Sequence, residues 1–181
     1  MKNSKIYVIV AVEHNTGIGK NGKIPWNLKK DMQHFKKITT TTQDPTKQNA
    51  VVMGNITWES LPDNFRPLAG RKNLILAREL DYKPDREGIP VRHSIEDGLK
   101  LLKEDESVET IFMIGGASIY KQSVELPELE GIYITIIEKS YDCDTFFPQV
   151  PGRFNKETLL GEDGEDGIKI KFYLKCFSSF I

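Results

Sequence analysis

Short apolar runs rich in β-branched residues alternate along the chain with segments of helical periodicity, and this alternation limits the possible folds most. The runs have the length and composition of strands and cover 5–12, 49–54, 73–77, 109–116, 131–138 and 167–177. Helical patterns separate most of them, at 28–38, 56–61, 95–103 and 117–125. Strands that alternate with helices predict an α/β fold with a mostly parallel central sheet and helices on both faces.

The last two predicted strands lack a helix between them, so the C-terminal one is expected to join the sheet as an antiparallel hairpin strand. Their connector is acidic and glycine-rich, and residues 162–166 are expected to form a solvated loop. The threonines at 39–42 favour extended chain over helix because they are β-branched. A length of 181 residues without repeats or low-complexity linkers predicts one domain, 1–181.

The composition excludes several classes of partner. The 25 Lys and Arg nearly balance the 26 Asp and Glu, so no bulk field attracts nucleic acid or an anionic membrane. Cys143 and Cys176 lie far apart, which argues against a disulfide framework or a metal site and favours a reducing compartment. The N-terminal apolar run is too short to span a bilayer. We therefore expect a cytoplasmic protein without a metal, nucleic-acid or membrane partner.

The stretch "GIGKNGKIPW", residues 17–26, contains the G-x-G-x-x-G spacing of dinucleotide-binding loops. In such loops a helix begins at the third glycine. Here Pro25 keeps Ile24 out of the helical region, so no helix can follow Gly22 directly. The next strand also lacks the acidic residue that would bind a ribose. The remaining interpretation is a mobile lid over a strand end.

The helix predicted after the lid places an acidic residue on an apolar stripe. Leu28, Met32, Phe35 and Ile38 follow helical spacing, and Asp31 lies among them while the neighbouring lysines occupy other faces. Two interpretations stay open from this helix alone. Asp31 is either solvated or paired at the edge of the stripe, or it is a carboxylate that faces an apolar cleft and needs a ligand with hydrogen-bond donors.

Two strand ends suit phosphate groups. Gly54 leads into a helix that starts with Asn55, and Gly115 and Gly116 lead into one that starts with Ala117. Each is weak alone, but ligands of open α/β sheets collect at this carboxyl edge. Positive residues also follow strand ends, and they suit an additional phosphate or a carboxylate: Arg71, Arg78, Arg92 and His93.

The motifs "GIGKNGKIPW", Asp31 on its helix, "VVMGNITWESLP", "RPLAGR", "FMIGGASIY" and "DTFFP" occur in this order, and with them the chain resembles dihydrofolate reductases over nearly its whole length. The resemblance implies NADPH-dependent reduction of dihydrofolate to tetrahydrofolate, with hydride added at C6 and a proton at N5. It also implies that folate-analogue inhibitors bind and that the protein is a monomer. A related pterin or pyrimidine reductase and a non-catalytic nucleotide-binding domain remain as alternatives.

The resemblance assigns roles to individual residues. Asp31 would bind the 2-amino group and N3 of the pterin and promote protonation, with support from Trp26 and Thr135. The other substrate-binding residues would be Ile9, Met32, Phe35, Leu68, Arg71, Ile114 and Tyr120. The cofactor-binding residues would be Ala11, Gly17, Ile18, Gly19, Lys20, Gly22, Gly54, Asn55, Ile56, Thr57, Ala77, Arg78, His93, Gly115, Gly116, Ala117, Ser118 and Ile119. In the family the two glycines that match Gly115 and Gly116 are joined by a cis bond.

The sequence departs from the family pattern at two positions on the cofactor side. Asn55 stands where an Arg or Lys is common, and Ala77 where a hydroxyl residue often helps to hold the 2′-phosphate. The preference for NADPH over NADH is therefore open. The longer segments at 39–49 and 147–166 indicate a eukaryotic-like enzyme, either separate or fused to thymidylate synthase as in some members.

Overall fold

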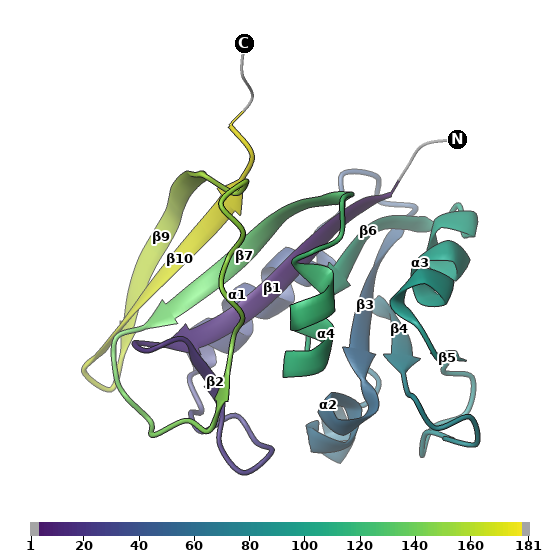
Figure 1. Cartoon of the computed structure of the whole chain (residues 1–181), viewed down its shortest axis with the longest axis horizontal. Coiled ribbons are helices and arrows are strands. Elements are labelled where there is room, and N and C mark those ends of the chain that lie inside the picture. The colour runs from purple at the N-terminus through teal and green to yellow at the C-terminus, as the bar shows by residue number, and fades with distance from the viewer. Residues whose placement is uncertain (1–3, 179–181) are drawn as a thin grey trace.

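The computed structural model describes residues 4–178 as an α/β protein built on one large sheet (Figure 1). The helices of this part of the chain are α1 (Lys29–Thr40), α2 (Asn55–Ser60), α3 (Ile95–Glu104) and α4 (Ala117–Ser123), with a 3₁₀ turn at Asp63–Phe65. The strands are β1 (Lys5–Glu13), β2 (Gly17–Gly19), β3 (Gln48–Gly54), β4 (Arg71–Leu76), β5 (Val91–Arg92), β6 (Val108–Met113), β7 (Leu129–Ile137), β8 (Thr145–Phe146), β9 (Lys156–Glu165) and β10 (Ile168–Cys176).

The main sheet has eight strands in the order β5-β4-β3-β6-β1-β7-β10-β9. All pairs from β5 to β7 are parallel, whereas β10 pairs antiparallel with both β7 and β9. The predicted fold class is thereby confirmed. Because β1, β3, β4 and β6 are parallel, their carboxyl ends meet at one edge of the sheet, as expected for a ligand site.

Alternating side chains of the inner strands supply two separate cores. Ala50 and Val52 of β3 join the cluster that packs against α3 and α4, while Val51 and Met53 join the cluster on the side of α1 and α2. Figure 1 shows α3 and α4 in front of the sheet and α1 behind it. Burial on both faces explains why "NAVVMG" reads as a continuous apolar run and not as an alternating one.

The acidic connector near the C-terminus corrects the sequence prediction. Residues 162–165 belong to β9, and the turn to β10 contains only Asp166 and Gly167, both with positive φ (52° and 75°). A two-residue turn of this kind is the Asp-Gly hairpin turn, which fixes the register of the strands on either side. Four of the five residues of the predicted loop therefore form the exposed end of a ten-residue edge strand.

Other boundaries differ from the prediction by one to three residues, and two of them have a clear local feature beside them. The helix α1 includes Thr39 and Thr40, whose hydroxyls donate to the carbonyls of Phe35 and Lys36 one turn back, at 2.7 and 2.8 Å. The strand β6 ends at Met113, before the two glycines.

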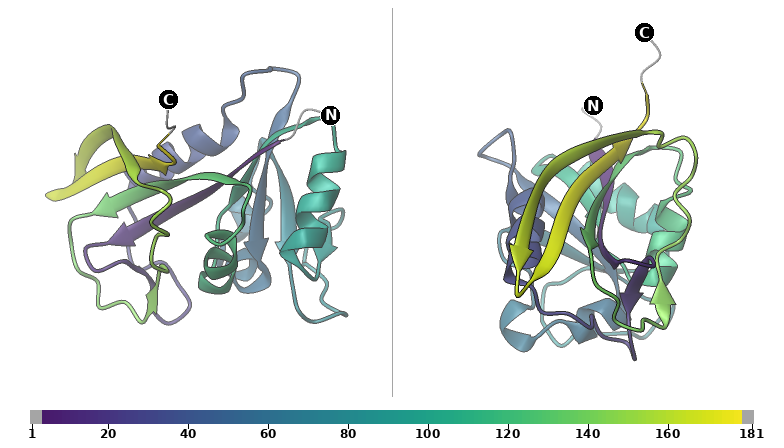
Figure 2. Two further views of the ribbon diagram at one scale, coloured as in Figure 1. Left: turned by 45° about the horizontal axis from the view of Figure 1, so that its top comes forward. Right: turned by 90° about the vertical axis from the view of Figure 1, so that its left-hand side faces the viewer.

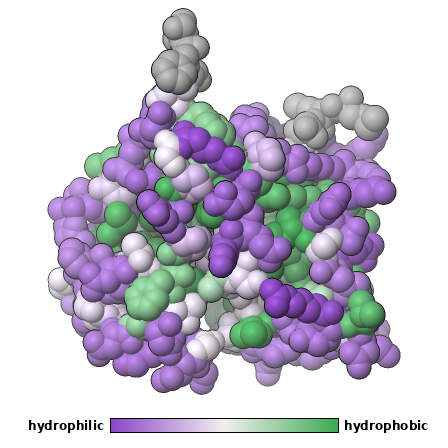
Figure 3. Space-filling model, in the orientation of Figure 1, coloured by the Kyte–Doolittle hydropathy of each residue, from purple (hydrophilic) through white to green (hydrophobic). Residues whose placement is uncertain are grey.

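Within the described residues no helix is long and apolar enough to cross a bilayer. Hydrophilic side chains cover most of the face shown in Figure 3.

Candidate active site

A cleft of about 710 Å³ opens at the carboxyl edge of the parallel strands. Its walls come from the end of β1, the lid that follows it, the starts of α2 and α4, and the end of β4. Many predicted cofactor residues line it: Ala11, Ile18, Gly19, Gly22, Gly54, Asn55, Ile56, Thr57, Ala77, Arg78, His93, Gly116, Ala117, Ser118 and Ile119. Trp26, Ile114 and Tyr120 border the same space. Most of the predicted cofactor-binding residues therefore line one cavity.

Asp31, the third residue of α1, is buried with only 8 % of its surface exposed. Burial raises the pKa of its carboxyl from 3.8 to about 6, and the neighbouring Trp26 indole and Thr135 hydroxyl oppose that rise by favouring the ionised form. Nε1 of Trp26 is itself buried and makes no hydrogen bond of normal geometry to a described residue. The structure therefore excludes a solvated Asp31 and places the carboxyl in a buried position beside the cleft, next to Trp26 and Thr135.

Thr135 reaches this position because β7 is a central strand. It pairs with Ala11 of β1 on one side and with Phe172 of β10 on the other. With pairing on both sides, its side chain has little freedom to move away from Asp31. The predicted group of Asp31, Trp26 and Thr135 is thus brought together from α1, the lid and the sheet.

The hydroxyl of Tyr120 links the middle of β1 to the residue that follows β6. Its Oη lies 2.9 Å from the carbonyl oxygens of both Ile9 and Ile114, and its single proton can be donated to one of them at a time. Burial, and to a lesser degree the nearby Asp31, raises the pKa of this phenol, so it stays protonated. A Cβ on Gly115, where φ is 106°, would come within 2.8 Å of the Tyr120 ring. A glycine is required there on both grounds.

The two glycine turns predicted to suit phosphates touch each other. The N–H of Gly54 donates to the carbonyl of Gly115 at 2.8 Å, and the Gly115–Gly116 peptide is cis, as in the family resembled. A Cβ on Gly116 would lie 3.2 Å from the Thr57 hydroxyl oxygen, so this glycine keeps the hydroxyl accessible. The starts of α2 and α4 consequently present backbone N–H groups and hydroxyls to the same space.

Arg78 and His93 stand at the exposed end of this cleft. Arg78 approaches Ser118, with 3.5 Å between Nη2 and Oγ, and its exposed guanidinium keeps free donors. Nδ1 of His93 lies 2.9 Å from the Ala77 carbonyl oxygen, which leaves Nε2 available for another partner. Glycine turns, hydroxyls and an arginine in one cleft fit the phosphates of a dinucleotide.

Among the predicted substrate residues outside this cleft, Arg71 and Phe35 lie together. Nη1 of Arg71 donates to the Thr39 hydroxyl at 2.9 Å, its Nε donates to the Ala69 carbonyl at 3.1 Å, and its guanidinium lies over the Phe35 ring. Burial lowers the pKa of Arg71. Leu68 is buried in the core beside Phe35, whereas Met32 is 47 % exposed.

Comparison with known proteins agrees with this geometry. Residues 5–174 match the model of the dihydrofolate reductase family. The chain is 38 % identical to a dihydrofolate reductase of Heliothis virescens, covering 98 % of both chains, and 39 % identical to that of Drosophila melanogaster, covering 91 % of this chain and 93 % of the other. A solved structure of Schistosoma mansoni dihydrofolate reductase superposes with a TM-score of 0.82 at 36 % identity, covering 98 % of this chain and all of the other.

The chain belongs to the dihydrofolate reductase family. Its activity is that of a dihydrofolate reductase, an NADPH-dependent oxidoreductase of folate metabolism. The resemblance inferred from the motifs is confirmed by the family model and by relatives that match over nearly the full length.

Three predicted cofactor residues of this reductase do not line the cleft: Gly115, which packs against Tyr120, and two residues of the lid. Gly17 lies at the base of the lid, where its N–H donates to Oε1 of the buried Glu13 at 3.1 Å and a Cβ would meet the Cys143 side chain at 2.4 Å. The Lys20 ammonium lies 3.8 Å from the Asp142 carboxylate, outside the cleft. Both residues shape or anchor the lid.

Sequence reasoning missed the residues that hold the reductase lid in place. Asp144 accepts from the N–H of Asn21 at 2.7 Å and donates its own N–H to the Gly19 carbonyl at 3.0 Å, while the N–H of Phe147 donates to the Thr16 carbonyl. These bonds pair β2 with β8 across more than 120 residues of sequence. The motif "DTFFP" carried the signal, but nothing local in the sequence indicates what it contacts.

Proposed function

We propose that Asp31 recognises the pterin of dihydrofolate through the 2-amino group and N3 and supports protonation at N5. The observation that carries this role is a buried carboxyl with a pKa of about 6 on an apolar helix face. Near that pH the group exchanges between a carboxylate, which accepts two parallel hydrogen bonds, and a neutral carboxyl, which holds a proton inside the site. The carbonyls of Ile9 and Ile114 would accept from the 4-amino group of a diamino folate analogue, since dihydrofolate has an oxo group, itself an acceptor, at that position.

NADPH supplies the hydride that adds to C6 of the substrate. The residues of the chain orient this reaction and keep water out. Trp26 closes the lid above Asp31, and its indole favours the ionised form of that carboxyl. Excluding water strengthens the hydrogen bonds between the carboxylate and the pterin, because no solvent competes for the same atoms.

The cofactor-binding role falls to the residues that line the 710 Å³ cleft. The turn before α2 and the cis-glycine turn before α4 would hold the pyrophosphate with N–H groups and the Thr57 hydroxyl. Arg78, with His93 beside it, would meet the 2′-phosphate. Ala11, Ile18 and Gly19 would border the nicotinamide and its ribose.

An Asn55→Arg variant tests the cofactor assignment. Asn55 begins α2 at the wall of the cleft, so an added guanidinium there would donate charge-assisted hydrogen bonds to the phosphates. We expect NADPH to bind more tightly by about 1 kcal/mol, or roughly fivefold. Thr158→Arg, which makes the same charge change on the distant β9, is expected to leave the dissociation constant unchanged. If the unmodified protein, Asn55→Arg and Thr158→Arg all bind NADPH equally well, the phosphates do not lie near the start of α2.

The residues around Arg71 are proposed to hold the tail of dihydrofolate. The guanidinium is half-buried and kept in place by Thr39 and Ala69, so it is oriented in advance for a carboxylate. Phe35, which lies under it, would contact the benzoyl portion.

An Arg71→Lys variant is expected to raise KM for dihydrofolate by roughly tenfold, because an ammonium cannot bind a carboxylate with two parallel hydrogen bonds. The same variant is expected to leave KM unchanged for dihydropteroate, which lacks the glutamate. Steady-state rates with the two substrates measure this difference. An equal loss with both would contradict the assignment of Arg71 to the glutamate.

We further propose a single-domain, monomeric and cytoplasmic enzyme that binds folate analogues at the same Asp31 site. The continuous sheet from β5 to β9 supports one folding unit. Sedimentation velocity tests the monomer, and a dimer at micromolar concentration would contradict it.

A further inference from the structure

The helix that carries Asp31 begins without a cap of its own. Its N-cap residue is Leu28, whose side chain offers no acceptor to the exposed N–H groups of the first turn. Leu28 is instead buried in a cluster with Trp26, Ile170 and Phe172. The need for an apolar anchor at this position thus excludes the Ser, Thr, Asp or Asn that usually caps a helix.

A carboxylate from the far end of the sequence supplies the missing acceptor. The N–H of Lys30 donates to Oε2 of Glu165 at 2.9 Å, across 135 residues of sequence. The backbone N–H groups of Lys30 and Lys29 lower the pKa of Glu165, so the carboxyl is ionised at neutral pH. The Lys30 ammonium also lies 3.2 Å from the carboxylate of Asp163 on the same strand. Figure 2 shows the β9–β10 hairpin alongside α1.

The same hairpin fixes the other side of the site. The two-residue turn at Asp166 and Gly167 sets Glu165 opposite Ile168, and further along β10 Phe172 pairs with Thr135. One hairpin therefore contacts both the first turn of α1 and the strand that carries Thr135. The fixed register of this hairpin therefore helps to set the positions of both the first turn of α1, which carries Asp31, and Thr135.

We infer that Glu165 is a positioning residue for Asp31: it caps α1 from the β9–β10 hairpin and holds the first helical turn so that the Asp31 carboxyl faces Trp26 and Thr135. The inference rests on the proposed role of Asp31. Without an acceptor the first turn of a helix frays, because several of its N–H groups have no helical partner. Asp31 is the residue that directly follows the capped N–H.

Glu165→Ala, Glu165→Gln and Glu162→Ala separate this role from a general loss of stability. Glutamine keeps an oxygen that can accept from Lys30, and Glu162 lies on the same strand but pairs with Lys169. We expect Glu165→Ala to raise KM for dihydrofolate by up to roughly fivefold, the factor that applies if the whole effect of a lost helix cap falls on substrate binding. Its NADPH dissociation constant should stay the same, since no residue of α1 lines the cofactor cleft. Glu165→Gln and Glu162→Ala should both resemble the unmodified enzyme.

A measurement without turnover keeps this test independent of the Asp31 mechanism. In the protein without ligands, ¹³C NMR of the carboxyl groups should show the pKa of Asp31 moving toward its ordinary range in Glu165→Ala, because water reaches a frayed turn. Hydrogen exchange at the Lys30 amide should accelerate in the same variant. A Glu165→Ala protein with the pKa and KM of Glu162→Ala would overturn the inference, as would a Glu165→Gln protein as impaired as Glu165→Ala.

Discussion

Replacing Asp31 with asparagine is expected to lower turnover at neutral pH by roughly 100-fold or more while NADPH still binds. The amide cannot hold the proton that the carboxyl holds near pH 6, and it cannot accept two parallel hydrogen bonds from the pterin. Acidic conditions should restore part of the rate, because protons then come from solvent. NADPH consumption from pH 5 to 8 measures this, and equal activity of both proteins at pH 7 would contradict the role of Asp31.

The same substitution is expected to stabilise the fold at neutral pH. The folded pKa of about 6 lies above the unfolded value of 3.8, so stability is lost as the pH rises from about 4 to 6 and Asp31 ionises. A difference of about two pKa units corresponds to roughly 3 kcal/mol. Asp31→Asn should therefore be more stable than the unmodified protein at pH 7 by up to this amount. Urea unfolding at pH 7 measures this difference. A less stable variant would show that the ionised Asp31 does not destabilise the fold.

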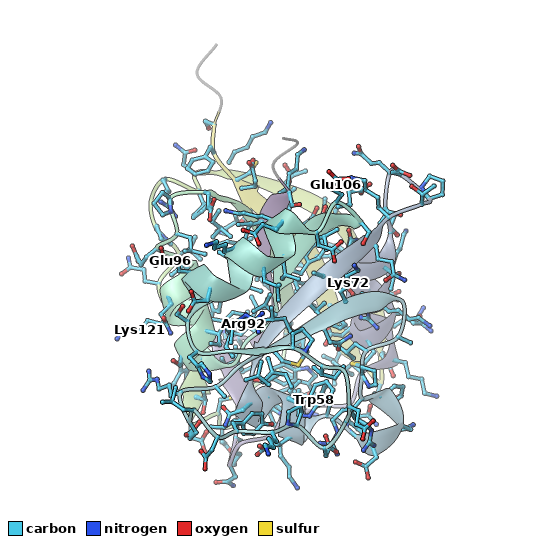
Figure 4. The ribbon with its side chains drawn as sticks, turned by 90° about the vertical axis from the view of Figure 1, so that its right-hand side faces the viewer. Trp58, Lys72, Arg92, Glu96, Glu106 and Lys121 are labelled. Carbon is cyan, nitrogen blue, oxygen red and sulfur yellow. The ribbon has the colours of Figure 1, made fainter. Side chains whose placement is uncertain are left out.

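Trp58→Ala is expected to lower the free energy of unfolding by about 3–5 kcal/mol. Trp58 is fully buried between α2 and the sheet, and its indole N–H donates to Asp85 at 2.9 Å in the loop after β4. Figure 4 shows it enclosed by the ribbon at the α2 end of the molecule. Because α2 begins with Asn55 at the cleft, a loosened helix should also weaken NADPH binding.

Trp58→Phe is the matched control for this prediction. It retains an aromatic ring in the same pocket and loses the hydrogen bond to Asp85, which remains partly solvated. Urea unfolding of the two variants should give a clearly smaller loss for phenylalanine. An alanine variant that loses less than about 1 kcal/mol would mean that α2 does not depend on this side chain for its packing.

Local pattern was sufficient to predict the central strands and the helices that flank them. The buried run "NAVVMG" and the glycine turns at two strand ends reflect burial and turn geometry within a few residues, and both were located correctly. The rejection of a dinucleotide-type loop was also correct, since α1 begins at Lys29 after the lid. The sequence leaves the burial of Asp31 open, because a helical stripe does not reveal what covers it.

The strand β9 was missed because its composition is unfavourable for strands and its stability comes from pairing with β10. The Asp-Gly pair at 166–167 was the available signal for a tight turn. The contacts of Glu165 with α1 and of Asp144 with the lid join residues more than 120 positions apart. No local propensity encodes such contacts, and they appear only once the sheet order is known.

The pKa of the Asp31 carboxyl, measured by ¹³C NMR and assigned by its absence in Asp31→Asn, tests the central claim most directly. We expect a value of about 6, and a higher one in Thr135→Val, where a hydroxyl that favours the ionised form is removed. A value near 3.8, unaffected by Thr135, would mean that water reaches the carboxyl and that Asp31 is not the buried proton-holding group of the active site.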